Sequence, residues 1–324
     1  MKNLFFIQKN LFIISLISSM MICLSSNSFM SMWMSMEINL FSFIPLISSN
    51  QKIMSEKSTM LYFLIQSISS SIFLISFSMN LENLKSMMTT MMILAIFMKL
   101  GMFPFHFWMI SIIEGMEWEQ AFILMTLQKI IPIMILSFMT QQKMIIMFWI
   151  LNSLIACISG LTMFSTRKIL GFSSINHLSI MLMAMILSKK IFKAYFIIYS
   201  FMTFSATKMM KTTNLNFLFQ SFTEMKKNKA NNFTFLLIFL SMAGVPPLLG
   251  FMPKMLTLMA MLKSEMFLTI TLILIFNTLS TFFYLRMSMN NLLMNSNFSK
   301  TKLKTKELKL PLYLIFSPML FLSF

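Results

Sequence analysis

Four ionisable side chains lie inside segments of the sequence that are otherwise strongly apolar. They are Glu37, Lys99, Lys129 and Lys254. A charge near the centre of a membrane helix costs about 2.5–3.5 kcal/mol, so four of them cost on the order of 10 kcal/mol. This cost is comparable to the whole stability of a typical domain. Charges of this kind usually belong to ion or proton paths, and proton transfer between amines and a carboxylate is the chemistry that we expect here.

A long lysine stem can also lift its ammonium group out of the lipid interior from a position near a helix end. This explanation could cover Lys99 and Lys254, which lie close to helix-breaking residues. It does not cover Lys129, which is ten residues into its apolar run, or Glu37, whose side chain is short. The four charges together therefore favour a role in function over the alternative that their side chains merely reach the membrane surface.

Glycine and proline surround two of the three lysines. Gly101 and Pro104 follow Lys99, and residues around Lys254 include Gly244, Pro246, Pro247, Gly250 and Pro253. Proline removes a backbone donor and interrupts a helix, and in lipid such a break persists only inside a protein bundle or beside a wet cavity. Two broken helices in equivalent positions of two halves are typical of transporters with inverted repeats. Pro132 follows Lys129 in the same manner.

The two histidines differ in the role that we expect for them. His177 could relay protons because an imidazole titrates near neutral pH, whereas we expect His106 to brace the broken helix. Two histidines 71 residues apart, with no Asp and with Cys23 and Cys157 in separate apolar runs, make a poor metal set. Haem ligation by the two histidines is the one alternative in which they would bind a metal. The sequence contains no nucleotide-binding or flavin-binding motif. We therefore expect no cofactor and no metal in this chain.

The composition is that of an integral membrane protein. Hydrophobic residues make up 57% of the 324 residues and charged residues 11%, against about 25% charged in a soluble domain. The 41 methionines and 37 phenylalanines, with two arginines and no aspartate, indicate an AT-rich organelle gene in which ATA also encodes methionine. The alternative is that methionine serves as a flexible apolar filler.

A bilayer needs about 20 apolar residues per helix, which predicts an all-α polytopic protein with eleven transmembrane helices. The predicted spans are 4–25, 29–48, 58–80, 86–113, 119–140, 144–165, 168–188, 191–212, 233–262, 267–289 and 309–324. The first could pass for a signal peptide, but it lacks an A-x-A-like site. We expect a single membrane domain over 1–324, with five-helix inverted repeats at 4–140 and 144–289 and a C-terminal helix at 309–324.

The basic residues predict the orientation of the chain. Of the 26 lysines and arginines, 17 fall on the side of the N-terminus, six fall in the opposite loops, and three lie within spans. By the positive-inside rule, the N-terminus faces the interior compartment and the C-terminus faces out. Basic loops also favour contact with anionic lipids, whereas nucleic-acid binding is not expected.

Five separated motifs carry a family resemblance. In chain order they are SMEINLFSFIPL, MKLGMFPFHFW, TLQKIIPI, TRKILGFSSINHLS and AGVPPLLGFMPK. With them, residues 25 to 290 resemble the family of NADH–ubiquinone oxidoreductase chain 2, the antiporter-like proton-pumping subunits of respiratory complex I. Departures from the family's pattern are Leu127, Ile110 and Thr162–Met163, which concern local packing and the second half of the broken helix.

The resemblance implies a proton channel in the mitochondrial inner membrane, with the N-terminus in the matrix and the C-terminus toward the intermembrane space. The family's functional residues match Glu37, Lys99, Lys129 and Lys254, the charges identified above. The resemblance also implies other membrane-arm subunits and phospholipids such as cardiolipin as partners. NADH, FMN, iron–sulfur clusters and ubiquinone would belong to other parts of the complex.

The mechanism expected from these residues begins at Lys99, which Glu37 would hold in its charged form. A weaker pair would release the proton through Lys129 and His177 to Lys254. Two other functions stay open at this point. A stand-alone cation/proton antiporter would transport ions without redox partners, and a structural membrane subunit would have no proton path of its own.

Overall fold

The computed structural model describes residues 2–49, 53–79, 85–139, 142–221, 229–246 and 248–293. Within these ranges the chain is α-helical, and the extended structure is limited to an isolated bridge between Ser165 and Phe217. Six helices or helix pairs in the described part are long and apolar enough to cross a membrane. The all-α membrane fold is thus confirmed. The predicted number of eleven spans is not confirmed. The predicted helix at 309–324 lies outside the described residues.

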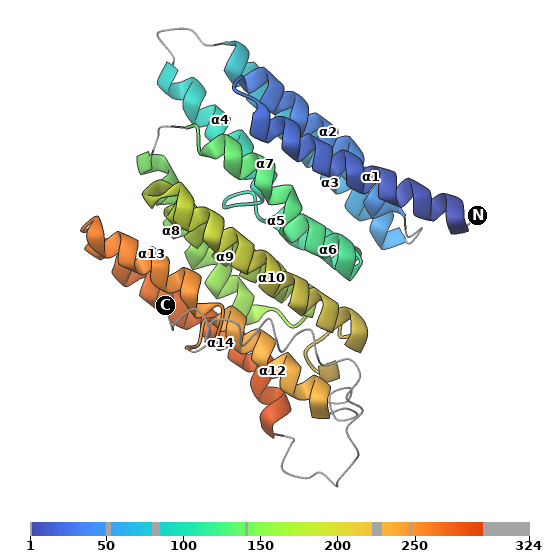
Figure 1. Cartoon of the computed structure of the whole chain (residues 1–324), viewed down its shortest axis with the longest axis vertical. Helices are drawn as coiled ribbons and strands as arrows, with labels where there is room; N and C mark the ends of the chain where they lie inside the picture. Colours follow the sequence, from blue (N-terminus) through green and yellow to red (C-terminus); the bar gives the residue numbers. More distant parts are fainter. Residues whose placement is uncertain are drawn as a thin grey trace. The chain divides into compact units, whose positions relative to one another are not determined.

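The chain divides into two compact units, and the first comprises Met1–Lys143 (Figure 1). In this unit α1 packs on α2, α2 on α3 and α3 on α4, while α7 contacts both α2 and α4. Its helices are α1 (Lys2–Ser25), α2 (Phe29–Ser48), α3 (Ile53–Ser78), α4 (Lys85–Leu100), α5 (Phe107–Gly115), α6 (Trp118–Met125) and α7 (Leu127–Leu136).

The second unit comprises Met144–Phe324, although the helix at its start begins two residues earlier. Here α9 lies against α10, α13 and α14, and α12 packs on α14. Its helices are α8 (Gln142–Thr162), α9 (Thr166–Leu187), α10 (Lys189–Thr213), α12 (Lys229–Ala243), α13 (Phe251–Lys263) and α14 (Phe267–Leu293).

Serine is abundant in the helices, and its hydroxyls are satisfied locally. Ser35 Oγ donates to Met32 O at 2.6 Å and Ser42 Oγ donates to Asn39 O at 2.9 Å, both within α2. A hydroxyl that bonds to its own helix three residues back leaves no unpaired polar group to face lipid or the core. Serine is therefore compatible with these apolar helices.

The core of the second unit surrounds α9, whose residues are buried from Thr166 to Ala184 with few exceptions. A cluster of Trp149, Met183, Met261 and Ile273 joins α9 to three other helices, α8, α13 and α14. A helix that is enclosed on nearly all sides can hold polar groups away from lipid, so α9 is a suitable place for a buried histidine.

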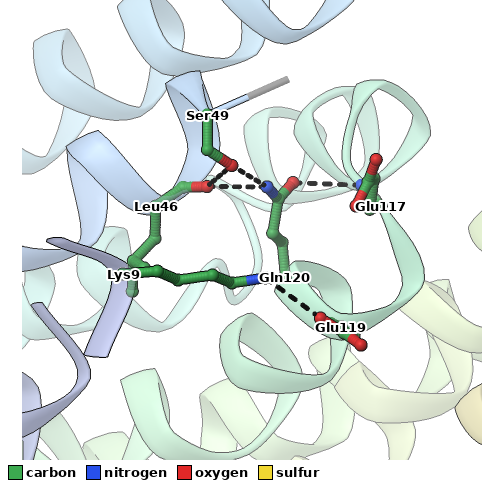
Figure 2. Close-up of polar contacts among 6 residues, drawn as sticks. All are labelled: Lys9, Leu46, Ser49, Glu117, Glu119 and Gln120. Atoms are coloured by element: carbon green, nitrogen blue, oxygen red, sulfur yellow. Dashed lines mark hydrogen bonds and ion pairs between the residues drawn. The ribbon is translucent and has the colours of Figure 1, made fainter. Parts of the chain in front are cut away.

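A polar clamp fixes the C-terminal end of α2 to the start of α6 (Figure 2). Gln120 Nε2 donates to Leu46 O at 2.6 Å and to Ser49 Oγ at 3.3 Å, while its Oε1 accepts from Glu117 N at 3.0 Å. The last contact is half of a capping box at the start of α6. One amide thus satisfies an end carbonyl of α2 and a free N–H of α6, and it sets these two helices relative to each other.

Candidate functional site

Lys99 occupies the last turn of α4, immediately before the first helix break. Gly101 adopts φ +66°, a left-handed conformation that favours glycine. Gly101 N donates to Met98 O at 3.2 Å and Met102 N donates to Phe97 O at 3.1 Å. This pair of bonds is a Schellman motif, so the break predicted from Gly101 and Pro104 is confirmed. The ammonium group of Lys99 stands at the negative end of the helix dipole, which favours a cation.

Side chains from other helices satisfy the carbonyls that the first break exposes. Trp108 Nε1, on α5, donates to Met98 O at 2.9 Å. Gln66 Nε2, on α3, donates to Lys99 O at 3.3 Å. The broken end of α4 is therefore held from two directions, and the Lys99 side chain, 7% exposed, lies inside the unit.

Lys129 follows a second interruption that the sequence did not predict. Thr126 separates α6 from α7 with φ −119° and ψ −77°, and its hydroxyl donates to Phe122 O at 2.7 Å. Lys129 N bonds to Thr126 O at 3.1 Å, a tighter turn than a regular α-helix makes. Lys129 is 3% exposed, and Pro132 follows it one turn later inside α7.

Lys99 and Lys129 line the same small cavity in the first unit. Its volume is ≈ 20 Å³, and a cavity needs about 10–15 Å³ to hold one water molecule. The residues that line it are Met36, Asn39, Tyr62, Gln66, Lys99, Leu100, Trp108, Met109, Leu124, Gln128, Lys129, Ile131 and Pro132. The lining combines two lysine side chains with amide and phenol groups, all from α2, α3, α4 and α7, and such groups carry exchangeable protons.

Three of the polar residues at this cavity were not predicted from the sequence: Asn39, Tyr62 and Gln128. Asn39 lies two residues after Glu37 and Gln128 lies directly before Lys129, so adjacency to a charge was the available signal. Gln66 lies within an apolar run, and its contact with the Lys99 carbonyl could not be inferred from the sequence.

Glu37 is half-buried on α2 and does not form a direct ion pair with Lys99; both residues belong to the described part of the chain. The two side chains interact electrostatically over a longer distance. Met36 and Asn39, which flank Glu37 on the same helix, reach the cavity directly. The expected pair of Glu37 and Lys99 is thus an electrostatic interaction and not an ion pair in this structure.

His106 is the residue that precedes α5 on the far side of the first break. It is 5% exposed, its ring lies 4.1 Å from that of Phe107 between centroids, and Ile110 N donates to its carbonyl at 3.5 Å. The side chain makes no cap hydrogen bond to α5. Its predicted role as a brace stays a prediction.

The second unit contains a break of the same kind, between α12 and α13. Gly244 adopts φ +82°, its N–H donates to Ser241 O at 3.0 Å, and Val245 N donates to Leu240 O at 3.3 Å. These bonds again form a Schellman motif. Lys254 reaches back from α13 and donates from Nζ to Ala243 O at 2.8 Å. In this unit the lysine therefore follows the break and binds the carbonyl at the end of α12. Pro247 lies outside the described residues.

His177 lies in the core of the second unit, on α9, with both ring nitrogens near phenol groups. Nδ1 is 3.0 Å from Tyr195 Oη, on α10, and Nε2 is 3.4 Å from Tyr284 Oη, on α14. The imidazole is 1% exposed, and the Tyr199 ring centroid lies 5.3 Å from its own. A neutral imidazole has one donor and one acceptor, so one phenol donates to it and the other accepts.

Lys254 also interacts electrostatically with Cys157, a buried thiol on α8. The thiol donates to Phe276 O at 3.2 Å. Among the described residues, no three His, Cys, Asp or Glu side chains are grouped in a way that could hold a metal ion. The expectation that this chain carries no cofactor stays a prediction.

Comparison with known families identifies the fold and its relatives. Residues 26–283 match the family model of the NADH:quinone oxidoreductase/Mrp antiporter transmembrane region. The chain belongs to this family. The matched residues include both helix breaks and all four membrane charges.

Curated relatives in this family support the resemblance that the motifs gave. A protein of Anopheles gambiae is 35% identical over 89% of this chain and 87% of its own length. A protein of Locusta migratoria is 33% identical over 93% of this chain and 90% of its own. A protein of Gallus gallus is 35% identical over 85% of this chain and 83% of its own length. All three are named NADH-ubiquinone oxidoreductase chain 2, so the predicted resemblance is confirmed.

Solved structures share the fold at low sequence identity. A chain of respiratory complex I from Thermus thermophilus aligns with TM-score 0.83 and 17% identity, over 98% of this chain and 77% of its own. A chain of the Mrp complex from Dietzia sp. aligns with TM-score 0.74 and 13% identity, and the alignment covers 86% of this chain and 59% of that one. A chain of an archaeal membrane-bound sulfane sulfur reductase aligns with TM-score 0.77 and 13% identity, and the alignment covers 96% of this chain and 71% of that one. The antiporter-like architecture is thereby confirmed.

Proposed function

We propose that this chain is a membrane-arm subunit of respiratory complex I that moves protons from the mitochondrial matrix to the intermembrane space. NADH oxidation and ubiquinone reduction take place in other subunits of the complex. The observation that carries this proposal is the small cavity of the first unit, which both Lys99 and Lys129 line. The names of the relatives support the same assignment.

In the first unit, a proton passes from Lys99 to Lys129 across the cavity. The negative charge of Glu37 and the negative C-terminal end of the α4 dipole both attract the ammonium group of Lys99. Movement of Glu37 away from Lys99 removes part of this support, and the cost of burying an unpaired ammonium then favours release of the proton. Moving one charge through 100 mV costs about 2.3 kcal/mol, which is the work that the change around Lys99 has to supply.

In the second unit, Lys254 is the protonated group and His177 is the relay. The hydrogen bond from Lys254 to Ala243 O stabilises the ammonium at the break. His177, between two phenol groups, can accept a proton on one nitrogen while it gives one up from the other. His106 serves as a brace at the start of α5.

Exposed apolar side chains along the helices fit contact with phospholipids such as cardiolipin and with other membrane-arm subunits. The distribution of basic residues favours the N-terminus in the matrix. The chain carries no cofactor of its own under this proposal.

The test compares Lys129→Met with Lys57→Met in the assembled complex. Lys57 is an exposed lysine on α3 of the same unit and makes a matched control. We expect Lys129→Met to lower the number of protons moved per electron, and Lys57→Met to leave it unchanged. An unchanged ratio in Lys129→Met, with normal assembly, would show that this subunit is a structural spacer. Ion transport by the isolated chain without redox partners would support a stand-alone antiporter instead.

A further inference from the structure

The Gln128 carboxamide at the cavity is held in one orientation by two hydrogen bonds. Its Oε1 accepts from Asn39 Nδ2 at 2.8 Å and from Tyr62 Oη at 3.2 Å. A carbonyl oxygen has two lone pairs, and both are used here. The donors come from α2 and α3, so three helices meet at this one oxygen. The amide nitrogen must therefore point away from Asn39 and Tyr62.

Two polar atoms of this group have no partner among the described residues. They are Gln128 Nε2, which can only donate, and Asn39 Oδ1, which can only accept. Both atoms are buried, Asn39 is 5% exposed, and both residues line the cavity. A buried polar atom without a hydrogen-bond partner destabilises a fold, so a ligand that serves both atoms is expected.

A single water molecule fits these requirements in size and in chemistry. The cavity volume of ≈ 20 Å³ exceeds what one water needs. Water accepts two hydrogen bonds and donates two, and the cavity offers an amide donor, a carbonyl acceptor and two lysines. We infer that Asn39, Gln128 and Tyr62 are positioning residues that hold one water between Lys99 and Lys129. This inference rests on the proposed function of the two lysines.

The four partners set the direction in which a proton can move. The water accepts from Gln128 Nε2 and from the Lys99 ammonium, and it donates to Asn39 Oδ1 and to the neutral Lys129 amine. In the transfer, an N–H bond of Lys99 breaks and a new O–H bond forms on the water. The O–H bond that faces Lys129 then breaks and an N–H bond forms there. One proton has moved, and the water remains a water.

Amides suit this role better than carboxylates. An amide neither takes up the proton at neutral pH nor forms an ion pair that would trap the ammonium. Tyr62 contributes by filling the second lone pair of Gln128 Oε1, which prevents the carboxamide from rotating its oxygen into the cavity.

The direct test is a high-resolution density map of the assembled complex. We expect a water within hydrogen-bonding distance of both Asn39 Oδ1 and Gln128 Nε2, and we expect it to be lost in Asn39→Leu. A map of the unmodified complex in which no water touches both atoms would overturn the inference, whatever the variants do.

The functional test measures protons moved per electron in Asn39→Leu and in Gln128→Met, a change that keeps the side-chain volume. Ser42→Ala, which removes a buried hydroxyl one turn along α2, is the matched control. We expect both amide variants to lower the ratio as much as Lys129→Met does, and the control to leave it unchanged. A merely structural role would reduce the amount of assembled complex without changing the ratio.

The arms of this test separate the two proposals. If Lys129→Met lowers the ratio and neither amide variant does, the inference about the positioning residues is wrong and the proposed function stands. If Lys129→Met leaves the ratio unchanged, the proposed function itself fails. If one amide variant does not assemble, the other variant and the density map decide.

Discussion

Replacing Gly244 with alanine tests how the second helix break holds Lys254. Gly244 adopts φ +82°, and a Cβ atom added there would lie 2.9 Å from Lys254 Cδ and 3.1 Å from its Nζ. The lysine would have to move, and its 2.8 Å hydrogen bond to Ala243 O would be lost. The perturbation therefore acts on the backbone and on the functional side chain together.

The expected loss of stability is the sum of these two contributions. An L-residue in the left-handed region costs about 1–2 kcal/mol. A hydrogen bond from a charged group contributes about 1.5–3 kcal/mol. The free energy of unfolding of Gly244→Ala should thus fall by about 2.5–5 kcal/mol. In a Lys254→Ala background the side chain is absent, so Gly244→Ala should cost only the backbone part.

The assay is equilibrium unfolding of the full chain in mixed detergent micelles, applied to both single variants and the double variant. The cycle should give a coupling free energy of about 1.5–3 kcal/mol between Gly244 and Lys254. Additive effects within about 0.5 kcal/mol would refute the reasoning, because they would mean that the glycine does not act through the lysine.

Three further changes test the contacts that set the helices of the first unit. Gln120→Leu removes the clamp between α2 and α6 and should lower the unfolding free energy by about 1–3 kcal/mol in the same assay; no change would mean that the clamp is dispensable. Trp108→Phe removes the indole donor to Met98 O, and we expect a loss of about 1–3 kcal/mol with a lower proton-to-electron ratio; stability equal to that of the unmodified chain would contradict this role. Glu119→Gln breaks the exposed ion pair with Lys9, whose N–O distance is 3.1 Å, and should cost under about 1 kcal/mol at low salt and less at high salt. A larger loss that persists in high salt would indicate a role beyond this pair.

Much of the fold was predictable because its determinants are local. The apolar runs gave the positions of the helices, and glycine beside proline marked both helix breaks, at Gly101 and Gly244. The interruption at Thr126 was not predicted, because no glycine or proline lies at that position. It depends on a threonine hydroxyl that competes for a backbone carbonyl, which many threonines in regular helices also do.

The candidate site was only partly predictable, for a different physical reason. Charges in lipid are costly, so Lys99 and Lys129 were evident from the sequence alone. Asn39 and Tyr62 were missed because a buried amide or phenol is common between packed helices. Their meaning depends on contacts with Gln128, which lies 89 and 66 residues away along the chain. Such pairings follow from the tertiary packing and leave no local pattern.

The central claim is that Lys99 and Lys129 exchange protons across one shared cavity. The most direct measurement is the proton-to-electron ratio of assembled complexes that carry Lys99→Met, Lys129→Met or both changes. Each single change should lower the ratio by the same amount, and the double variant should lower it no further, because either change interrupts one path. A double variant that loses the sum of two separate effects, or single variants with the normal ratio, would contradict the claim.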